Sequence, residues 1–146
     1  MRRWSKLQKE IEQLFAEGVD LRIQCRAYRM ASQRGSTDLP RYWVTLGKDV
    51  IWDYPRDFGN LTEDYPYLTD IGAISDLIRD YIDTPVAALL VKPFNDQWHL
   101  TEILLAVDRR IGRRKLGQLR KKLNHPGARA VLAARNRRVR VQVSVR

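Results

Sequence analysis

Apolar and polar residues repeat along the chain with two different periods. Near the start, apolar residues recur every three or four positions, which predicts a helix from about residue 2 to residue 17, ended by Gly18. The apolar face of this helix consists of Trp4, Leu7, Ile11 and Leu14. Residues 20–32 instead alternate with a period of two, which predicts a half-buried strand. The phase slips at Ala27 and Tyr28, where we expect a β-bulge.

The stretch RYWVTLGKDVIWDYP predicts a β-hairpin. Residues 42–46 and 50–54 are rich in aromatic and β-branched side chains, and Gly47-Lys48-Asp49 supplies the turn. The polar residues 32–40 before it are expected to form a loop or wide turn, which gives a three-stranded antiparallel meander. Residues 55–68, interrupted by two prolines and a glycine, predict an irregular connection. A helix over residues 69–83, capped by Thr69 or Asp70, should follow.

The last third of the chain is expected to be helical. Its apolar stripes predict one helix over residues 98–111 and a second over residues 113–124, separated by Gly112, and a short third helix beginning at Pro126. In residues 138–146, valine alternates strictly with arginine, glutamine or serine. That alternation predicts a strand, which would be a fourth strand of the sheet, an edge that pairs with a second copy, or an unpaired tail.

These elements define the α+β class, with an N-terminal helix, a three-stranded antiparallel meander and a helical C-terminal half packed on one face. We expect a single domain, residues 1–146. The N-terminus lacks the apolar segment of a signal peptide, and no apolar run approaches membrane-spanning length, so a cytoplasmic bacterial protein is expected. Cys25 is interpreted as a small core residue, with a reactive thiol as the alternative.

Charge changes this picture because it is unevenly distributed. The formal net charge is +10, yet residues 1–97 hold 13 Lys and Arg against 15 Asp and Glu, a net −2. Residues 98–146 hold 14 Lys and Arg against Glu102 and Asp108, a net +12. Residues 53–83 contain more Asp and Glu than Lys and Arg. Such a distribution favours a polyanion or an acidic protein as the partner of the basic third.

The cations are densest in residues 107–124, where Asp108 is the only acid. Apolar residues at helical spacing require this stretch to pack against a core first, which leaves its cations on the outer surface. Dense Lys and Arg without local acids bind phosphate through counterion release. The candidate nucleic-acid-binding residues are Arg109, Arg110, Arg113, Arg114, Lys115 and Lys121. Asp108 either orients the neighbouring arginines through a bidentate pair or forms an ordinary intrahelical pair.

Two tryptophans of the hairpin, Trp43 and Trp52, are expected to lie near each other across its strands. The simpler interpretation is that they pack against a helix. The alternative is that they stack on unpaired bases, which Arg22, Gln24 and Arg26 on the polar face of the first strand would suit.

The sequence contains no glycine-rich phosphate loop and no nucleophile motif, so we expect no catalytic residue, cofactor or metal. His99 and His125 are interpreted as structural residues. Asp49 and Asp53, an even interval apart, would share one sheet face beside Lys48, as a Mg²⁺-dependent nuclease site requires. Exposed sheet residues are the simpler interpretation of this pair.

The stretches RYWVTL, IWDYP and AVDRRIGRRKL resemble the motifs W-V-T-L…I-W-D-Y-P and D-R-R-x-G-R-R of a family of small bacterial proteins of unknown function. The matching residues are Trp4, Trp43, Trp52, Asp53, Pro55, Asp108, Arg109, Arg110 and Gly112. The resemblance implies a shared fold and no particular activity, cofactor or partner. The leading hypothesis from the residues is a non-catalytic protein that binds nucleic acid or an acidic protein. A protein-interaction module, dimeric through the C-terminal strand, and a metal-dependent nuclease are the alternatives.

Overall fold

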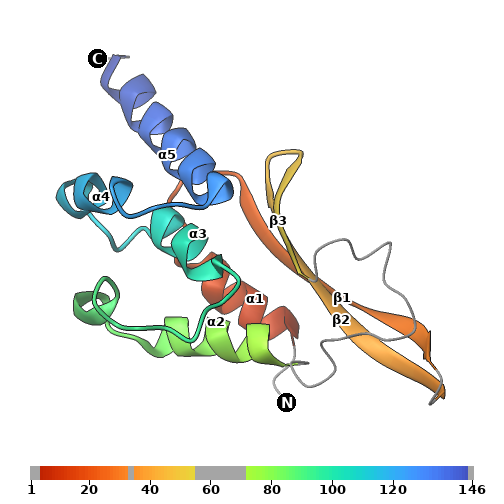
Figure 1. Ribbon diagram of the computed structural model, residues 1–146. Coiled ribbons are helices and arrows are strands. Elements are labelled where there is room, and N and C mark those ends of the chain that lie inside the picture. The colour runs from red at the N-terminus through yellow and green to blue at the C-terminus, as the bar shows by residue number, and fades with distance from the viewer. Residues whose placement is uncertain (1–3, 33–34, 55–71, 145–146) are drawn as a thin grey trace.

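The computed structural model describes residues 4–32, 35–54 and 72–144, and the side chains of residues 4–27, 40–54 and 72–137 within them. An antiparallel sheet is formed by β1 (Leu21–Ser32), β2 (Gly35–Leu46) and β3 (Asp49–Tyr54), in that order. The helices are α1 (Trp4–Glu12), α2 (Ala73–Asp83), α3 (Leu100–Val107), α4 (Arg113–Arg120) and α5 (Pro126–Ser144), with a short 3-10 helix, η3, at Val86–Ala88. The helices gather on one side of the sheet (Figure 1), so the predicted α+β architecture is confirmed.

The sheet is longer than the sequence pattern indicates. β1 and β2 pair continuously from Leu21 opposite Leu46 to Ser32 opposite Gly35, so residues 35–40 are strand and the predicted loop there is wrong. The bulge expected at Ala27 is also wrong, because the bulge lies between Val44 and Thr45, where β2 pairs with β3. Pairing continues through polar residues because the ladder satisfies backbone groups regardless of which side chains face outward.

The predicted hairpin between β2 and β3 is confirmed. Gly47 and Lys48 connect the two strands, and Gly47 has a φ of 61°, in the left-handed region that glycine adopts without a steric penalty. The Gly47 N–H donates to the carbonyl oxygen of Asp20 at 2.8 Å. The turn is thereby fixed to the segment that leads into β1.

The core lies between the inner face of the sheet and the helices. The sheet contributes Leu21, Ile23, Tyr42, Val44, Trp52 and Tyr54, all buried. The Tyr42 hydroxyl lies 2.7 Å from Ser75 Oγ in α2, and Trp52 Nε1 donates to the Trp98 carbonyl oxygen at 2.8 Å. None of the described helices is both long and apolar enough to cross a membrane.

Cys25 lies against this core and is only partly exposed. Burial raises the pKa of the Cys25 thiol to about 11, although a hydrogen bond with Tyr42 opposes this effect. Because the thiolate is the reactive form of cysteine, the raised pKa favours the interpretation of Cys25 as a core residue.

The N-terminal helix ends at Glu12, earlier than predicted, because the chain next pairs with a distant segment. The Ala16 N–H donates to the Val107 carbonyl oxygen at 2.7 Å, and the Arg109 N–H donates to the Leu14 carbonyl oxygen at 2.7 Å. Phe15 and Asp108 thereby form an isolated antiparallel bridge. The bridge ties the start of the chain to the segment between α3 and α4.

The predicted C-terminal strand is wrong, because residues 126–144 form the single helix α5. Once the alanine-rich first half of this segment is helical, each further residue adds a hydrogen bond without a new nucleation cost. No glycine or proline after Gly127 interrupts it. Dimerisation through a C-terminal strand therefore loses its structural basis.

Two helical glycines give a matched test of this packing. A Cβ added at Gly127 in α5 would lie 2.7 Å from the Ile51 carbonyl oxygen of β3, whereas a Cβ at Gly117 in α4 would meet nothing within 4 Å. We expect Gly127→Ala to lower the free energy of unfolding by about 1–3 kcal/mol through overpacking. Gly117→Ala should raise it by about 0.5–1 kcal/mol, because alanine is the better helix former.

Urea unfolding followed by tryptophan fluorescence measures both effects. If the two substitutions shift the unfolding midpoint in the same direction, the close approach of α5 to β3 is incorrect.

Candidate nucleic-acid interface

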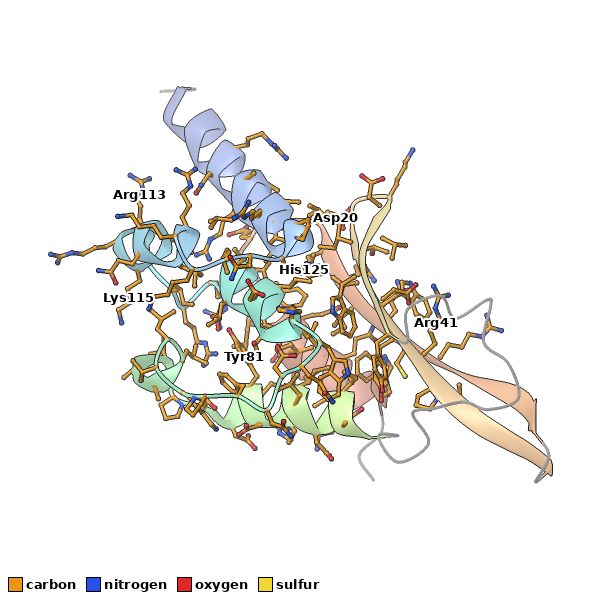
Figure 2. The ribbon with its side chains drawn as sticks, in the orientation of Figure 1. Asp20, Arg41, Tyr81, Arg113, Lys115 and His125 are labelled. Atoms are coloured by element: carbon orange, nitrogen blue, oxygen red, sulfur yellow. The ribbon has the colours of Figure 1, made fainter. Side chains whose placement is uncertain are left out.

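The helix α4 is built on an apolar stripe and a cationic outer surface. Leu116, Leu119 and Leu123 are buried, as their spacing predicts, while the remaining positions of the segment face solvent. We name six of its exposed residues the α4 cation cluster: Arg113, Arg114, Lys115, Arg120, Lys121 and Lys122. Figure 2 shows Arg113 and Lys115 extending away from the helical body, on the side of the molecule far from the sheet.

No described residue forms an ion pair with a member of the α4 cation cluster. Elsewhere in the described parts of the chain, several cations do have carboxylate partners: Arg41 with Asp53 at 3.0 Å, Arg79 with Asp83 at 2.8 Å and Lys92 with Asp80 at 2.6 Å. The sequence has no acid after Asp108. The charge of the cluster is therefore not neutralised by the described protein and attracts anions.

The segment between α3 and α4 determines where this helix points. The sequence predicts a helix through residue 111, but α3 ends at Val107, and Asp108 is extended with φ −67° and ψ 114°. Asp108 is completely buried, and its carboxylate accepts hydrogen bonds from the Arg110 backbone N–H at 2.9 Å and from its guanidinium at 2.8 and 3.0 Å. The carboxylate thus turns the chain out of α3 and stops the helix.

Two residues from other helices complete what we name the Asp108 cluster. The Tyr81 hydroxyl of α2 donates to Asp108 Oδ2 at 2.7 Å. The Arg135 guanidinium of α5 donates to the carbonyl oxygens of Asp108 and Ile111, each at 2.8 Å. Tyr81 lies in the interior of the helical layer in Figure 2. The cluster therefore joins α2, α5 and the linker that orients α4.

Protonation within the Asp108 cluster follows from burial and charge. Burial and the neighbouring Asp108 carboxylate raise the pKa of Tyr81, so its hydroxyl remains a donor. Hydrogen bonding to the Asp108 carboxylate raises the pKa of Arg110, and burial lowers that of Arg135, although a guanidinium remains charged in proteins.

The structure separates the six predicted nucleic-acid-binding residues into two groups. Arg113, Arg114, Lys115 and Lys121 lie on the open surface of α4 and its end. Arg110 is turned inward with its charge opposed by Asp108, so we leave it out of the interface. Arg109 is exposed, but its Nε donates to the Gln13 carbonyl oxygen at 2.8 Å. The Asp108–Arg110 pair lies outside any helix, unlike the intrahelical alternative.

The two hairpin tryptophans lie on opposite faces of the sheet, which corrects the expectation that they are neighbours. Trp43 is paired with Asp53, whereas Trp52 is paired with Val44 and lies in the core. Trp52 therefore cannot stack on a base. Trp43 is half-buried on the outer face, where the Arg41 guanidinium lies 5.0 Å from its ring centroid.

The bulge in the sheet also separates Asp49 from Asp53. Because Thr45 is paired with Val50 and Trp43 with Asp53, the register places Asp49, opposite Leu46, on the other face from Asp53. Asp53 is bound by Arg41 through both carboxylate oxygens. In the described part of the chain, no group of three or more His, Cys, Asp or Glu residues is arranged to hold a metal ion.

A groove of about 720 Å³ lies between β3 and the start of α5, and the sequence does not indicate it. We name it the β3–α5 groove; it is lined by residues 50–54, 97–99 and 125–127. His99 and His125, interpreted from the sequence as structural residues, have their rings stacked there with centroids 6.0 Å apart. His125 also caps α5, because its Nδ1 accepts the Gly127 N–H at 3.0 Å.

Comparison with known proteins gives a family and nothing more specific. No curated protein and no solved structure matches the chain. The model of the SF0329 protein family matches residues 3–72 and 68–136, which include β1 to β3, the Asp108 cluster and α4. This chain therefore belongs to the SF0329 protein family.

Proposed function

We propose that this protein is a non-catalytic, cytoplasmic nucleic-acid-binding protein that contacts phosphates through the α4 cation cluster. One observation carries the proposal: six exposed cations are gathered on one short helix and its end, and no described acid pairs with them. Surface cations that only keep a protein soluble are commonly interspersed with acids. Here the sequence has no acid from residue 109 onward.

Counterion release determines how the affinity depends on salt concentration. Each phosphate neutralised by Lys or Arg releases condensed cations, so the logarithm of the affinity falls linearly with the logarithm of the salt concentration. Contacts with phosphates carry no sequence information. The cations of the cluster are distributed around α4 rather than along one edge that could enter a groove and read bases. Binding should therefore be weak, sensitive to salt and tolerant of sequence.

The two halves of the D-R-R-x-G-R-R motif have separate tasks in this proposal. Asp108 and Arg110 form the buried pair that sets the direction of the linker, and Gly112 is the extended residue from which α4 begins. Arg113 and Arg114 then project into solvent in the first turn of α4. The internal pair positions the helix, and the outer pair binds phosphate.

A titration of fluorescently labelled single- and double-stranded oligonucleotides at salt concentrations between about 25 and 250 mM tests the proposal by anisotropy. If four to six cations contact duplex phosphates, the slope of log K against log salt should be about −4 to −5. Poly-glutamate of matched charge serves as the competitor that represents an acidic protein.

Failure to bind either oligonucleotide at the lowest salt would contradict the proposal. Displacement of the oligonucleotides by poly-glutamate at equal charge concentration would instead favour an acidic protein as the partner.

A further inference from the structure

The β3–α5 groove has the size of a small-ligand site and lies next to the proposed interface. Its volume of about 720 Å³ is within the range of pockets that hold small molecules. Its lining combines aromatic rings, the apolar residues Val50 and Ile51 and the polar side chains of Gln97 and the two histidines. Val50 is 54% exposed, so an apolar surface is available at the edge of the groove.

His99 is held in an unfavourable backbone conformation in this groove. It is the only described non-glycine residue with a positive φ, which is 64°, in the left-handed region that costs an L-residue about 1 kcal/mol. Its side chain is nevertheless 60% exposed, so burial of the imidazole does not compensate for the cost. Residues in such conformations occur preferentially at functional sites.

Glu102 fixes the orientation of the His99 ring. Its Oε2 lies 2.8 Å from His99 Nδ1, while its Oε1 accepts the backbone N–H groups of Asn124 at 2.6 Å and His125 at 3.3 Å. Burial alone would raise the pKa of Glu102, but these hydrogen bonds lower it below its ordinary value. An ionised carboxylate can only accept, so the His99 Nδ1–H donates to Glu102 and the ring is held in one orientation.

The second imidazole packs against the first. The rings of His99 and His125 are stacked with an interplanar angle of 27°, and the Gly127 N–H holds His125 through Nδ1. Planar side chains are the surfaces on which unpaired bases stack in nucleic-acid-binding proteins.

The chain connects this surface directly to the α4 cation cluster. Lys122 is followed after two residues by His125, and Asn124 between them is bound to Glu102. Three residues of extended chain span at most about 11 Å. The last cations of the cluster therefore lie close to His125 and provide the charge complementarity that a nucleic-acid strand requires.

We propose that the β3–α5 groove receives one unpaired base of a single strand, which stacks on the His99 imidazole. This inference rests on the proposed function and specifies its ligand class as single-stranded nucleic acid. In a duplex, the base edges are already paired and the base faces are stacked, so a duplex should bind through phosphates alone.

The variant His99→Asn tests the role of the ring. Asparagine tolerates a left-handed backbone and can donate an amide N–H to Glu102, so the fold should persist while the stacking surface is lost. We expect about a tenfold lower affinity for single strands, the typical effect of losing one base-stacking contact. Affinity for duplex of the same length should change less than about twofold. Val91→Ala, at a residue 79% exposed outside the groove lining, is the matched control.

A single strand containing 2-aminopurine reports the stacking itself, because the parent should change its fluorescence and His99→Asn should not. Equal single-strand affinity for parent and His99→Asn would overturn the groove inference, as would an equal loss on duplex. If the parent binds duplex through α4 yet fails these tests, the groove inference alone is wrong. Absence of binding to any oligonucleotide would instead overturn the proposed function.

Discussion

Replacement of Asp108 by asparagine is expected to lower the free energy of unfolding by about 3 kcal/mol or more. The carboxylate is completely buried and accepts hydrogen bonds from the Arg110 guanidinium and the Tyr81 hydroxyl. Asparagine removes the negative charge and leaves the partly buried guanidinium without its counter-charge. It also replaces one of the two acceptor oxygens by an NH2 donor, although both oxygens of Asp108 accept hydrogen bonds from Arg110 or Tyr81. Urea unfolding followed by tryptophan fluorescence measures the change.

Two further variants separate the ion pair from the rest of the site. Tyr81→Phe removes one hydrogen bond to the same carboxylate and should cost about 1 kcal/mol. Asp49→Asn changes an exposed carboxylate on β3 and should stay within about 0.5 kcal/mol of the parent. A cost for Asp108→Asn no larger than that of Asp49→Asn would show that the Asp108 cluster does not hold the linker.

Reversal of three charges in the α4 cation cluster, by Arg113→Glu, Arg114→Glu and Lys121→Glu together, is expected to lower the affinity for nucleic acid by about 100-fold at low salt. All three side chains are exposed, and none has an acidic partner among the described residues, so the substitutions break no internal pair. Each substitution removes an attraction to phosphate and adds a repulsion. Stability should change little for the same reason.

A second triple variant controls for the change in net charge. Lys6 and Lys9 of α1 and Lys48 of the β2–β3 turn are also exposed, and their replacement by glutamate changes the net charge by the same amount. Their effect on affinity should be below about fivefold, because screening limits the influence of distant surface charges. Equal losses in the two triple variants would mean that overall charge, rather than α4, attracts the nucleic acid.

Local periodicity was sufficient to predict the elements whose side chains have one clear inner face. Spacing and residue type predict both the buried stripe of Leu116, Leu119 and Leu123 and the turn at Gly47. The strand predicted from the alternating valines after residue 138 is wrong, because alternation describes only the side chains. A strand also requires the edge of another strand with which its backbone can form hydrogen bonds. A helix already begun at Pro126 extends at lower cost than a new strand.

The candidate site was only half predictable, because tertiary partners decide which cations remain on the surface. The sequence pattern does not distinguish Arg110 from Arg113 as a surface cation. In the structure, Asp108 binds Arg110, whereas Arg113 is exposed. Tyr81 and Arg135 complete the Asp108 cluster, and each lies 27 residues from Asp108 along the chain. The β3–α5 groove similarly depends on a bulge in the hairpin and on the approach of Gly127 to Ile51. No local pattern reports such contacts.

The most direct test of the central claim is the change in salt dependence when three cations of the cluster are neutralised. In Arg113→Gln, Arg114→Gln and Lys121→Gln combined, each lost phosphate contact should make the slope of log K against log salt less negative by about 0.9 on duplex, or about 3 in total. Replacement of Lys6, Lys9 and Lys48 by glutamine should give the same slope as that of the parent protein. A slope unchanged by the α4 substitutions would contradict the account, because those residues would then contact no phosphate.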